Sequence, residues 1–204
     1  MVRAIVLCAA AIALLASSAG AQYIGIFREP SATNCAAQVG PTPWVDLHVV
    51  MVFGGNVTEL VAAQFQITGA PETWTVENAL WVPDPGTTLN LGTPLFATPA
   101  GYNDPGVYIG FSGCRTGAAG DHVQLGRIIL LGAPTPENVH LRVEGSRPWW
   151  NLPPVCPLTI ACDGLYSTKV CVGGGEFVLN GSVPASCQVA VTPTTWTSVK
   201  KLYE

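Results

Sequence analysis

A two-residue alternation between residues 59 and 74 constrains the fold of this chain more than any other feature of its sequence. In the stretch ELVAAQFQITGAPETW, apolar side chains recur at every second position until a Gly-Ala-Pro step ends the pattern. Successive side chains of a β-strand point to opposite faces of its sheet. We therefore expect a strand over 60–68 whose buried face carries Val61, Ala63, Phe65 and Ile67.

The opposite face of this strand consists of small and uncharged polar side chains, namely Ala62, Gln64, Gln66 and Thr68. Such a strip is either plain solvated surface or a face that docks another molecule. We take Gln64, Gln66 and Thr68 as candidate protein-docking residues, and the sequence leaves both interpretations open.

Similar apolar patterns recur along the chain as far as residue 145. They occupy the segments 45–53, 76–82, 89–96, 107–111, 123–131 and 139–143. Turn-forming Gly and Pro clusters separate several of these segments, and none before residue 190 has a sustained helical period. Many short strands joined by such turns are typical of an all-β sandwich or barrel. The 123–131 segment is apolar nearly throughout, which predicts a central strand covered on both faces.

The first 21 residues have the features of a secretory signal peptide. Arg3 precedes an apolar run over 4–16, and the small residues Ala19-Gly20-Ala21 follow, as in a cleavable leader. The apolar run is shorter than the roughly 20 residues of a membrane span, although a short membrane anchor is the alternative. We expect cleavage after Ala21 and a protein that is secreted or held at the cell surface.

The charge balance argues against nucleic acid as a partner. Loss of residues 1–21 leaves eight basic and 13 acidic residues, a net charge of −5. A net negative charge disfavours binding to polyanions such as nucleic acid and to anionic membranes. No later segment is long and apolar enough to span a bilayer, so we expect no membrane span after cleavage.

An even number of cysteines follows the leader, namely Cys35, Cys114, Cys156, Cys162, Cys171 and Cys187. In a secreted chain this predicts three disulfides. A zinc site is the alternative, but no Cys-x-x-Cys pair occurs and the three histidines are scattered. We therefore predict no metal and no cofactor. Local spacing favours Cys162 with Cys171, and Cys35 with Cys114 would then tie the start of the domain to its middle.

The sequence changes in character after residue 145. We expect residues 146–190 to form a proline-rich connector and a disulfide-stapled β-hairpin packed on the sandwich, with PLTIAC and LYSTKVCV as the two hairpin arms. Residues 191–204 form a tail in which three apolar side chains lie at helical spacing, which predicts a short amphipathic helix. This helix docks on its own domain or on a partner. Its apolar residues are further protein-docking candidates, namely Trp196, Val199 and Tyr203.

The tryptophans fall into different sequence environments. Trp44, Trp74 and Trp81 lie at strand ends, where packing in the core or its rim is expected. Trp149 and Trp150 lie in the proline-rich connector. They are candidate carbohydrate-binding residues because planar aromatic rings stack on sugars. The alternative is that this pair folds over the end of the sandwich.

The order of the strand patterns resembles the cohesin family. The segments VDLHVVMVF, LVAAQFQIT, GVYIGFSG, GDHVQLGRIILLG and NVHLRVEG follow one another over about residues 42–145, and they are similar to core strands of cohesins and of carbohydrate-binding modules. This resemblance implies an antiparallel β-sandwich of jelly-roll type over 22–145 and a non-catalytic binding role. No dockerin-recognition residue carries over. The tail is similar to endings of uncharacterised secreted bacterial proteins.

The chain contains no recognisable catalytic motif. GFSGC at 110–114 departs from the Gly-x-Ser-x-Gly of serine hydrolases at its last position, and metalloprotease, P-loop and dinucleotide motifs are absent. We name no catalytic residue and expect a non-enzymatic protein that binds another extracellular protein or self-assembles. Polysaccharide binding, and an enzyme whose site the sequence does not reveal, are the alternatives. Sequons at Asn56 and Asn180 matter only in a host that glycosylates.

The cysteine count generates a first prediction. The secreted protein should contain three disulfides and no free thiol, because oxidising compartments favour complete pairing. Intact mass after thiol alkylation, with and without prior reduction, measures the number of thiols in each state. A single thiol that reacts without reduction or denaturant would contradict it.

Overall fold

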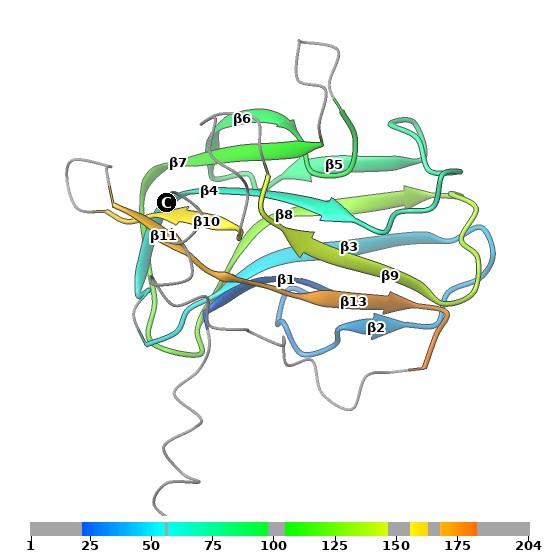
Figure 1. Ribbon diagram of the computed structural model, residues 1–204, viewed down its shortest axis with the longest axis horizontal. Helices are drawn as coiled ribbons and strands as arrows, with labels where there is room; N and C mark the ends of the chain where they lie inside the picture. The colour runs from blue at the N-terminus through cyan, green and yellow to red at the C-terminus, as the bar shows by residue number, and fades with distance from the viewer. Residues whose placement is uncertain (1–21, 56, 98–104, 147–155, 163–167, 183–204) are drawn as a thin grey trace, which may run out of the picture.

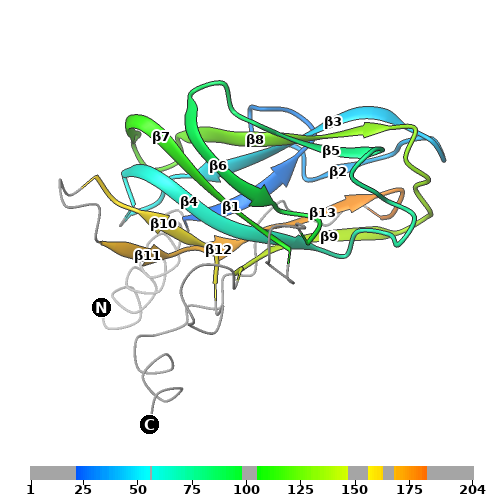
Figure 2. The ribbon, with the colours of Figure 1, turned by 90° about the horizontal axis from the view of Figure 1, so that it is seen from above.

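The computed structural model describes residues 22–55, 57–97, 105–146, 156–162 and 168–182. These residues form strands and no helix, and the strands are arranged in two sheets that face one another (Figures 1 and 2). The predicted all-β sandwich is therefore confirmed. No helix in the described part of the chain is long and apolar enough to cross a membrane.

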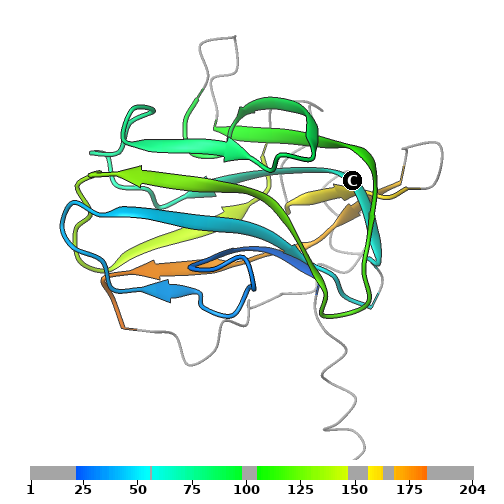
Figure 3. The same cartoon turned by 180° about the vertical axis from the view of Figure 1, so that it is seen from behind.

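One layer is a five-stranded sheet, seen from its outer side in Figure 3. Its order is β12 (Gly173–Gly174), β1 (Tyr23–Phe27), β3 (Trp44–Val52), β8 (His122–Leu131) and β5 (Ala79–Pro83). The strands β3, β8 and β5 confirm three of the predicted segments. β5 begins at Ala79 rather than at Val76, because the backbone N–H of Ala79 donates to the carbonyl of Thr75 and closes a turn there.

The other layer is an eight-stranded sheet. Along its main path the order is β11 (Lys169–Cys171), β10 (Leu158–Ile160), β4 (Glu59–Thr68), β9 (Val139–Glu144), β13 (Glu176–Leu179) and β2 (Ala36–Ala37). β7 (Gly106–Thr116) pairs with β4, and β6 (Thr87–Thr93) pairs with β7.

Strand β4 is the centre of the eight-stranded sheet. Its residues 62–64 pair with β7 and also with β10, so these two strands lie on its opposite edges. Its residues 66–68 pair with β9. The stretch with the clearest alternation in the sequence therefore holds three other strands by backbone hydrogen bonds.

Two parallel pairs join the beginning and the end of the described chain. β1 pairs with β12, and β2 pairs with β13, whereas all other strand pairs are antiparallel. The sequence analysis did not predict β1. Its segment YIGIF does not alternate, because four of its five residues are buried, and the rings of Tyr23 and Phe27 lie close above Gly25.

The core fills the space between the inner faces of the two sheets. From β4, the side chains of Ala63, Phe65 and Ile67 are buried, as predicted. The ring of Phe65 meets Trp81 of β5 edge to face, with a centroid distance of 6.0 Å. Such aromatic pairs contribute about 0.5–1.5 kcal/mol beyond the burial of their area, so this contact ties the two layers together.

The predicted alternation fails at the start of β4. Val61 was expected in the core, but Leu60 is fully buried there and Val61 is partly exposed. The pairing with β7 is irregular at the same place, because Leu60 pairs with Arg115 whereas Ala62 pairs with Gly110. Between these two pairs β4 advances by two residues and β7 by five, so the regular ladder is interrupted where the burial pattern of β4 changes.

The end of β4 is set by Gly69, the first residue of the Gly-Ala-Pro step. Its φ is +82°, and a Cβ atom at this position would collide with the carbonyl oxygen of His140. Only glycine adopts such a conformation without strain. The alternation stops there because β4 must turn away at a point where its backbone touches β9.

The C-terminal hairpin is confirmed, but with a different disulfide. β10 and β11 are antiparallel, and Cys156 pairs with Cys171 across them. The predicted Cys162–Cys171 pair is wrong because Cys162 bonds to Cys114. The predicted Cys35–Cys114 pair is wrong for the same reason.

The Cys114–Cys162 disulfide crosses β4, because it joins β7 to the segment that follows β10 on the other edge. The disulfide partners are the cysteines that lie close together in the sheet. Their spacing along the sequence does not reveal which cysteines these are. Cys35 is buried and disulfide-bonded. Cys187 and the predicted C-terminal helix lie outside the described residues.

Burial along β4 generates a second prediction. Phe65→Ala should lower the free energy of unfolding by about 3–5 kcal/mol, because it removes a fully buried ring and leaves a cavity. Gln66→Ala, on the exposed side of the same strand, should change it by less than about 0.5 kcal/mol. Urea denaturation of the two variants measures both values, and equal losses would show that the inner face of β4 is misassigned.

Candidate functional site

Polar side chains gather on the outer face of the eight-stranded sheet, where β4, β9 and β13 lie side by side. Gln66 lies opposite Glu144, and Thr68 lies opposite Arg142, which in turn lies opposite Glu176. We call this set the β4–β9–β13 surface, and its members are Gln66, Thr68, Asn138, His140, Arg142, Glu144 and Glu176. All of them are exposed or partly exposed.

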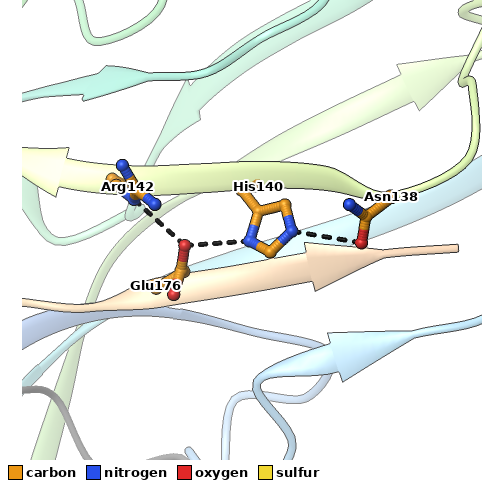
Figure 4. A network of polar contacts seen from close by, with 4 residues as sticks. All are labelled: Asn138, His140, Arg142 and Glu176. Atoms are coloured by element: carbon orange, nitrogen blue, oxygen red, sulfur yellow. Dashed lines mark hydrogen bonds and ion pairs between the residues drawn. The ribbon is translucent and has the colours of Figure 1, made fainter. Parts of the chain in front are cut away.

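A hydrogen-bonded network orders the centre of this surface (Figure 4). The carboxylate oxygen Oε1 of Glu176 lies 2.9 Å from Nδ1 of His140 and 3.0 Å from Nε of Arg142. Nε2 of His140 lies 3.1 Å from Oδ1 of Asn138. Neighbouring strands supply the partners, so the sheet itself fixes the positions of these side chains.

The network lowers the pKa of Glu176. Burial of the carboxyl by itself raises this pKa, but hydrogen bonds from His140 and Arg142, together with their charges, outweigh burial and hold the pKa below its ordinary value of 4.5. The carboxylate is therefore ionised at neutral pH and keeps its two partners in place.

Arg142 offers the largest unused hydrogen-bonding capacity of this surface. Its side chain is 61% exposed, and it contacts Glu176 through Nε rather than through its terminal amino groups. Within the described part of the chain, those amino groups make no hydrogen bond. A guanidinium in this state is well suited to a carboxylate of another molecule.

The sequence analysis found this surface only in part. Gln66 and Thr68 were predicted as docking residues, and the alternation over 139–143 already places His140 and Arg142 away from the core. Nothing in the sequence places β9 beside β4, or β13 beside β9. These pairings connect residues far apart in the chain, and Glu176 had no sequence signal at all.

Gln64 does not belong to this surface, and its expected exposure is wrong. Its side chain is only 4% exposed, and its Nε2 donates to the carbonyl of Ser146 over 3.0 Å. It lies between Tyr108 of β7 and Leu158 of β10 on the outer face. The chain beyond β9 reaches this position, so Gln64 stabilises the fold instead of facing solvent.

The burial of the tryptophans differs in part from the prediction. Trp74 is buried, with its Nε1 donating to the carbonyl of Pro134, and Trp81 packs on Phe65. Trp44 is 79% exposed, so its predicted packing in the core or rim is wrong. It is the first residue of β3, on the outer face of the five-stranded sheet. The remaining candidates lie outside the described residues, namely Trp149, Trp150, Trp196, Val199 and Tyr203.

Two further groups of polar residues have structural explanations. The carboxylate of Glu59 lies 3.8 Å from Sγ of Cys114, with Cys162 close by. Because both sulfurs form a disulfide, they offer no thiolate to a metal ion. The sequon residue Asn180 accepts from the backbone N–H of Val39 and donates toward carbonyls of the 135–136 turn. Its amide therefore holds a turn in the folded protein.

No family model matches the chain, and no curated protein matches it. Among solved structures, it is similar to a cohesin module from a family 33 glycoside hydrolase of Clostridium perfringens. The identity is 11% and the TM-score is 0.38, over 79% of this chain and 99% of that module. At this level of similarity the comparison assigns no residue, partner or reaction to this chain.

The Glu176 network generates a third prediction. The pKa of Glu176 is lower in the folded state than in the unfolded state. The ionised carboxylate therefore stabilises the folded protein at pH values above its unfolded-state pKa, and this stabilisation is lost as the pH falls through its folded-state pKa. Native protein should therefore be more stable than Glu176→Gln at about pH 7, and this difference should shrink toward about pH 2.

Urea denaturation at several pH values measures this difference. Glu144→Gln is the matched control, because Glu144 lies on the same surface outside the network. If both variants lost the same pH-dependent amount of unfolding free energy relative to native protein, the Glu176 network would not be the source of the effect.

Proposed function

We propose that this chain is a non-catalytic binding module of an extracellular protein assembly, and that it binds another protein through the β4–β9–β13 surface. The observation that carries the proposal is the network around Glu176, which orders His140 and Arg142 before any partner arrives. Side chains that are already ordered lose less conformational entropy on binding. The disulfides of the described sandwich support a location in an oxidising compartment.

The chemistry of the surface indicates the kind of partner. Arginine is enriched among the residues that dominate protein interfaces, and Arg142 still has its terminal amino groups to offer. We therefore expect the partner to present a carboxylate to Arg142, with polar contacts to Gln66 and Thr68. Both ring nitrogens of His140 are engaged, one by Glu176 and the other by Asn138, which supports a positioning role in binding over the activation of a nucleophile.

A matched pair of variants tests this proposal as a fourth prediction. Arg142→Ala should abolish or strongly weaken retention of a partner from the secreted proteins of the host. Arg115→Ala is the control, because Arg115 is also a partly exposed strand arginine, but it lies over the ring of Phe111 on β7 and belongs to neither end of the network. Native protein and the control, immobilised at equal density, should retain the same partner, which mass spectrometry identifies.

Equal retention of that partner by native protein and Arg142→Ala would overturn the proposed surface. Thermal unfolding of each variant shows that a loss of binding is not a loss of fold. The alternative function is polysaccharide binding through Trp149 and Trp150. Co-sedimentation of the protein with insoluble polysaccharides tests it. Retention on a polysaccharide that is lost in Trp149→Ala or Trp150→Ala would favour it.

A further inference from the structure

A second surface, on the opposite side of the sandwich, is apolar. The outer face of the five-stranded sheet carries five apolar side chains from β3, β8 and β5, namely Trp44, Leu80, Val82, Ile129 and Leu131. They lie in cross-strand register: Trp44 is opposite Leu131, and Ile129 is opposite Leu80. We call this set the Trp44 face, and Figure 3 shows its three strands toward the viewer, with no described element in front of them.

The sequence pattern did not predict that this face would be exposed. The apolar segment 123–131 predicted a strand covered on both sides. Its inner residues Ile128 and Leu130 are fully buried, but Ile129 and Leu131 remain partly exposed, and Trp44 is 79% exposed. Contiguous apolar side chains on a protein surface mark an interaction site more often than isolated ones do.

A pair of opposite charges borders the apolar side chains. Nη1 of Arg127 lies 2.6 Å from Oδ2 of Asp46, and the two side chains are 42% and 34% exposed. Asp46 lies opposite Ile129, and Arg127 lies opposite Val82. A second arginine, Arg28, donates to the backbone carbonyl of Asp46 over 3.0 Å. The face therefore combines an apolar area with the partly exposed Arg127–Asp46 ion pair, and Arg28 lies beside that pair.

This combination is self-complementary. A surface that binds a second copy of itself about a two-fold axis must offer both members of every contact. Here Arg127 of one copy can reach Asp46 of the other, and the reverse contact forms at the same time. Asp46 and Arg127 are already paired with each other within one copy, and an exchange of partners across the axis keeps both charges paired, whereas sugar hydroxyls would have to compete with that pair for hydrogen bonds. The face therefore fits a second copy of this chain better than it fits a polysaccharide.

The size of the face sets the strength of this contact. Five residues along each of three strands cover roughly 16 Å by 14 Å, at about 3.3 Å per residue and about 4.8 Å per strand. This footprint of roughly 220 Å² is small beside the about 800 Å² that each partner buries in a stable complex. The contact should be weak, with a dissociation constant that is micromolar or higher.

We propose that the Trp44 face is a weak self-association surface, through which two copies of the chain pack sheet against sheet. It is separate from the β4–β9–β13 surface, so each copy of a dimer keeps its partner-binding surface open. A dimer of this kind presents two binding surfaces at once, which raises the apparent affinity for a partner that carries two matching sites.

The test is sedimentation equilibrium of the full secreted chain over a wide range of concentrations. The weight-average mass of the native protein should rise from monomer toward dimer. Trp44→Ala should remain monomeric over the same range, and its fold should be unaffected because the ring is exposed. Arg142→Ala, on the opposite sheet, is the control and should associate like the native protein.

A charge exchange tests the geometry directly. Asp46→Arg and Arg127→Asp should each be monomeric alone, because like charges then meet across the axis. An equimolar mixture should regain association as a heterodimer, in which both contacts join opposite charges. A native protein that stays monomeric at every concentration, a Trp44→Ala variant that associates normally, or a mixture that does not recover would each overturn the proposal. Binding of monomeric native protein to insoluble polysaccharide, lost in Trp44→Ala, would assign the face to sugar instead.

Discussion

Pairing along both edges of β4 is the constraint on which the rest of the structure depends. β7 on one edge, and β10 and β9 on the other, are positioned by backbone hydrogen bonds to this one strand. Because Phe65 of β4 also meets Trp81 of the facing sheet, the same strand sets the spacing between the layers. The positions of β13 and Glu176 follow, since β13 pairs with β9.

The predictable parts of this fold are those that local chemistry decides. Alternation identified β3, most of β4 and β9, and turn residues separated the strands correctly. The failures come from contacts that are remote in the sequence. Irregular pairing of β4 with β7 accompanies the burial of Leu60 in place of Val61, and the approach of Ser146 buried Gln64. The disulfides followed neighbours in the sheet, which spacing along the chain does not report.

The candidate site shows the same division. A strand pattern can say that Gln66, Thr68 and Arg142 point outward, but it cannot say that they share a surface. That depends on the order of strands in the sheet, and Glu176 arrives from a strand more than thirty residues further along the chain. Trp44 was misjudged for a related reason: a large aromatic at a strand end suggests burial, and only the arrangement of layers shows which face it occupies.

The two parallel strand pairs have a mechanical consequence. β1 pairs with β12 and β2 pairs with β13, so the earliest and latest strands of the described chain run side by side in the same direction. When tension pulls the two ends apart, each pair is loaded in shear, and its hydrogen bonds must break together instead of one after another. A sandwich built in this way resists stretching along the chain better than one whose first and last described strands peel apart.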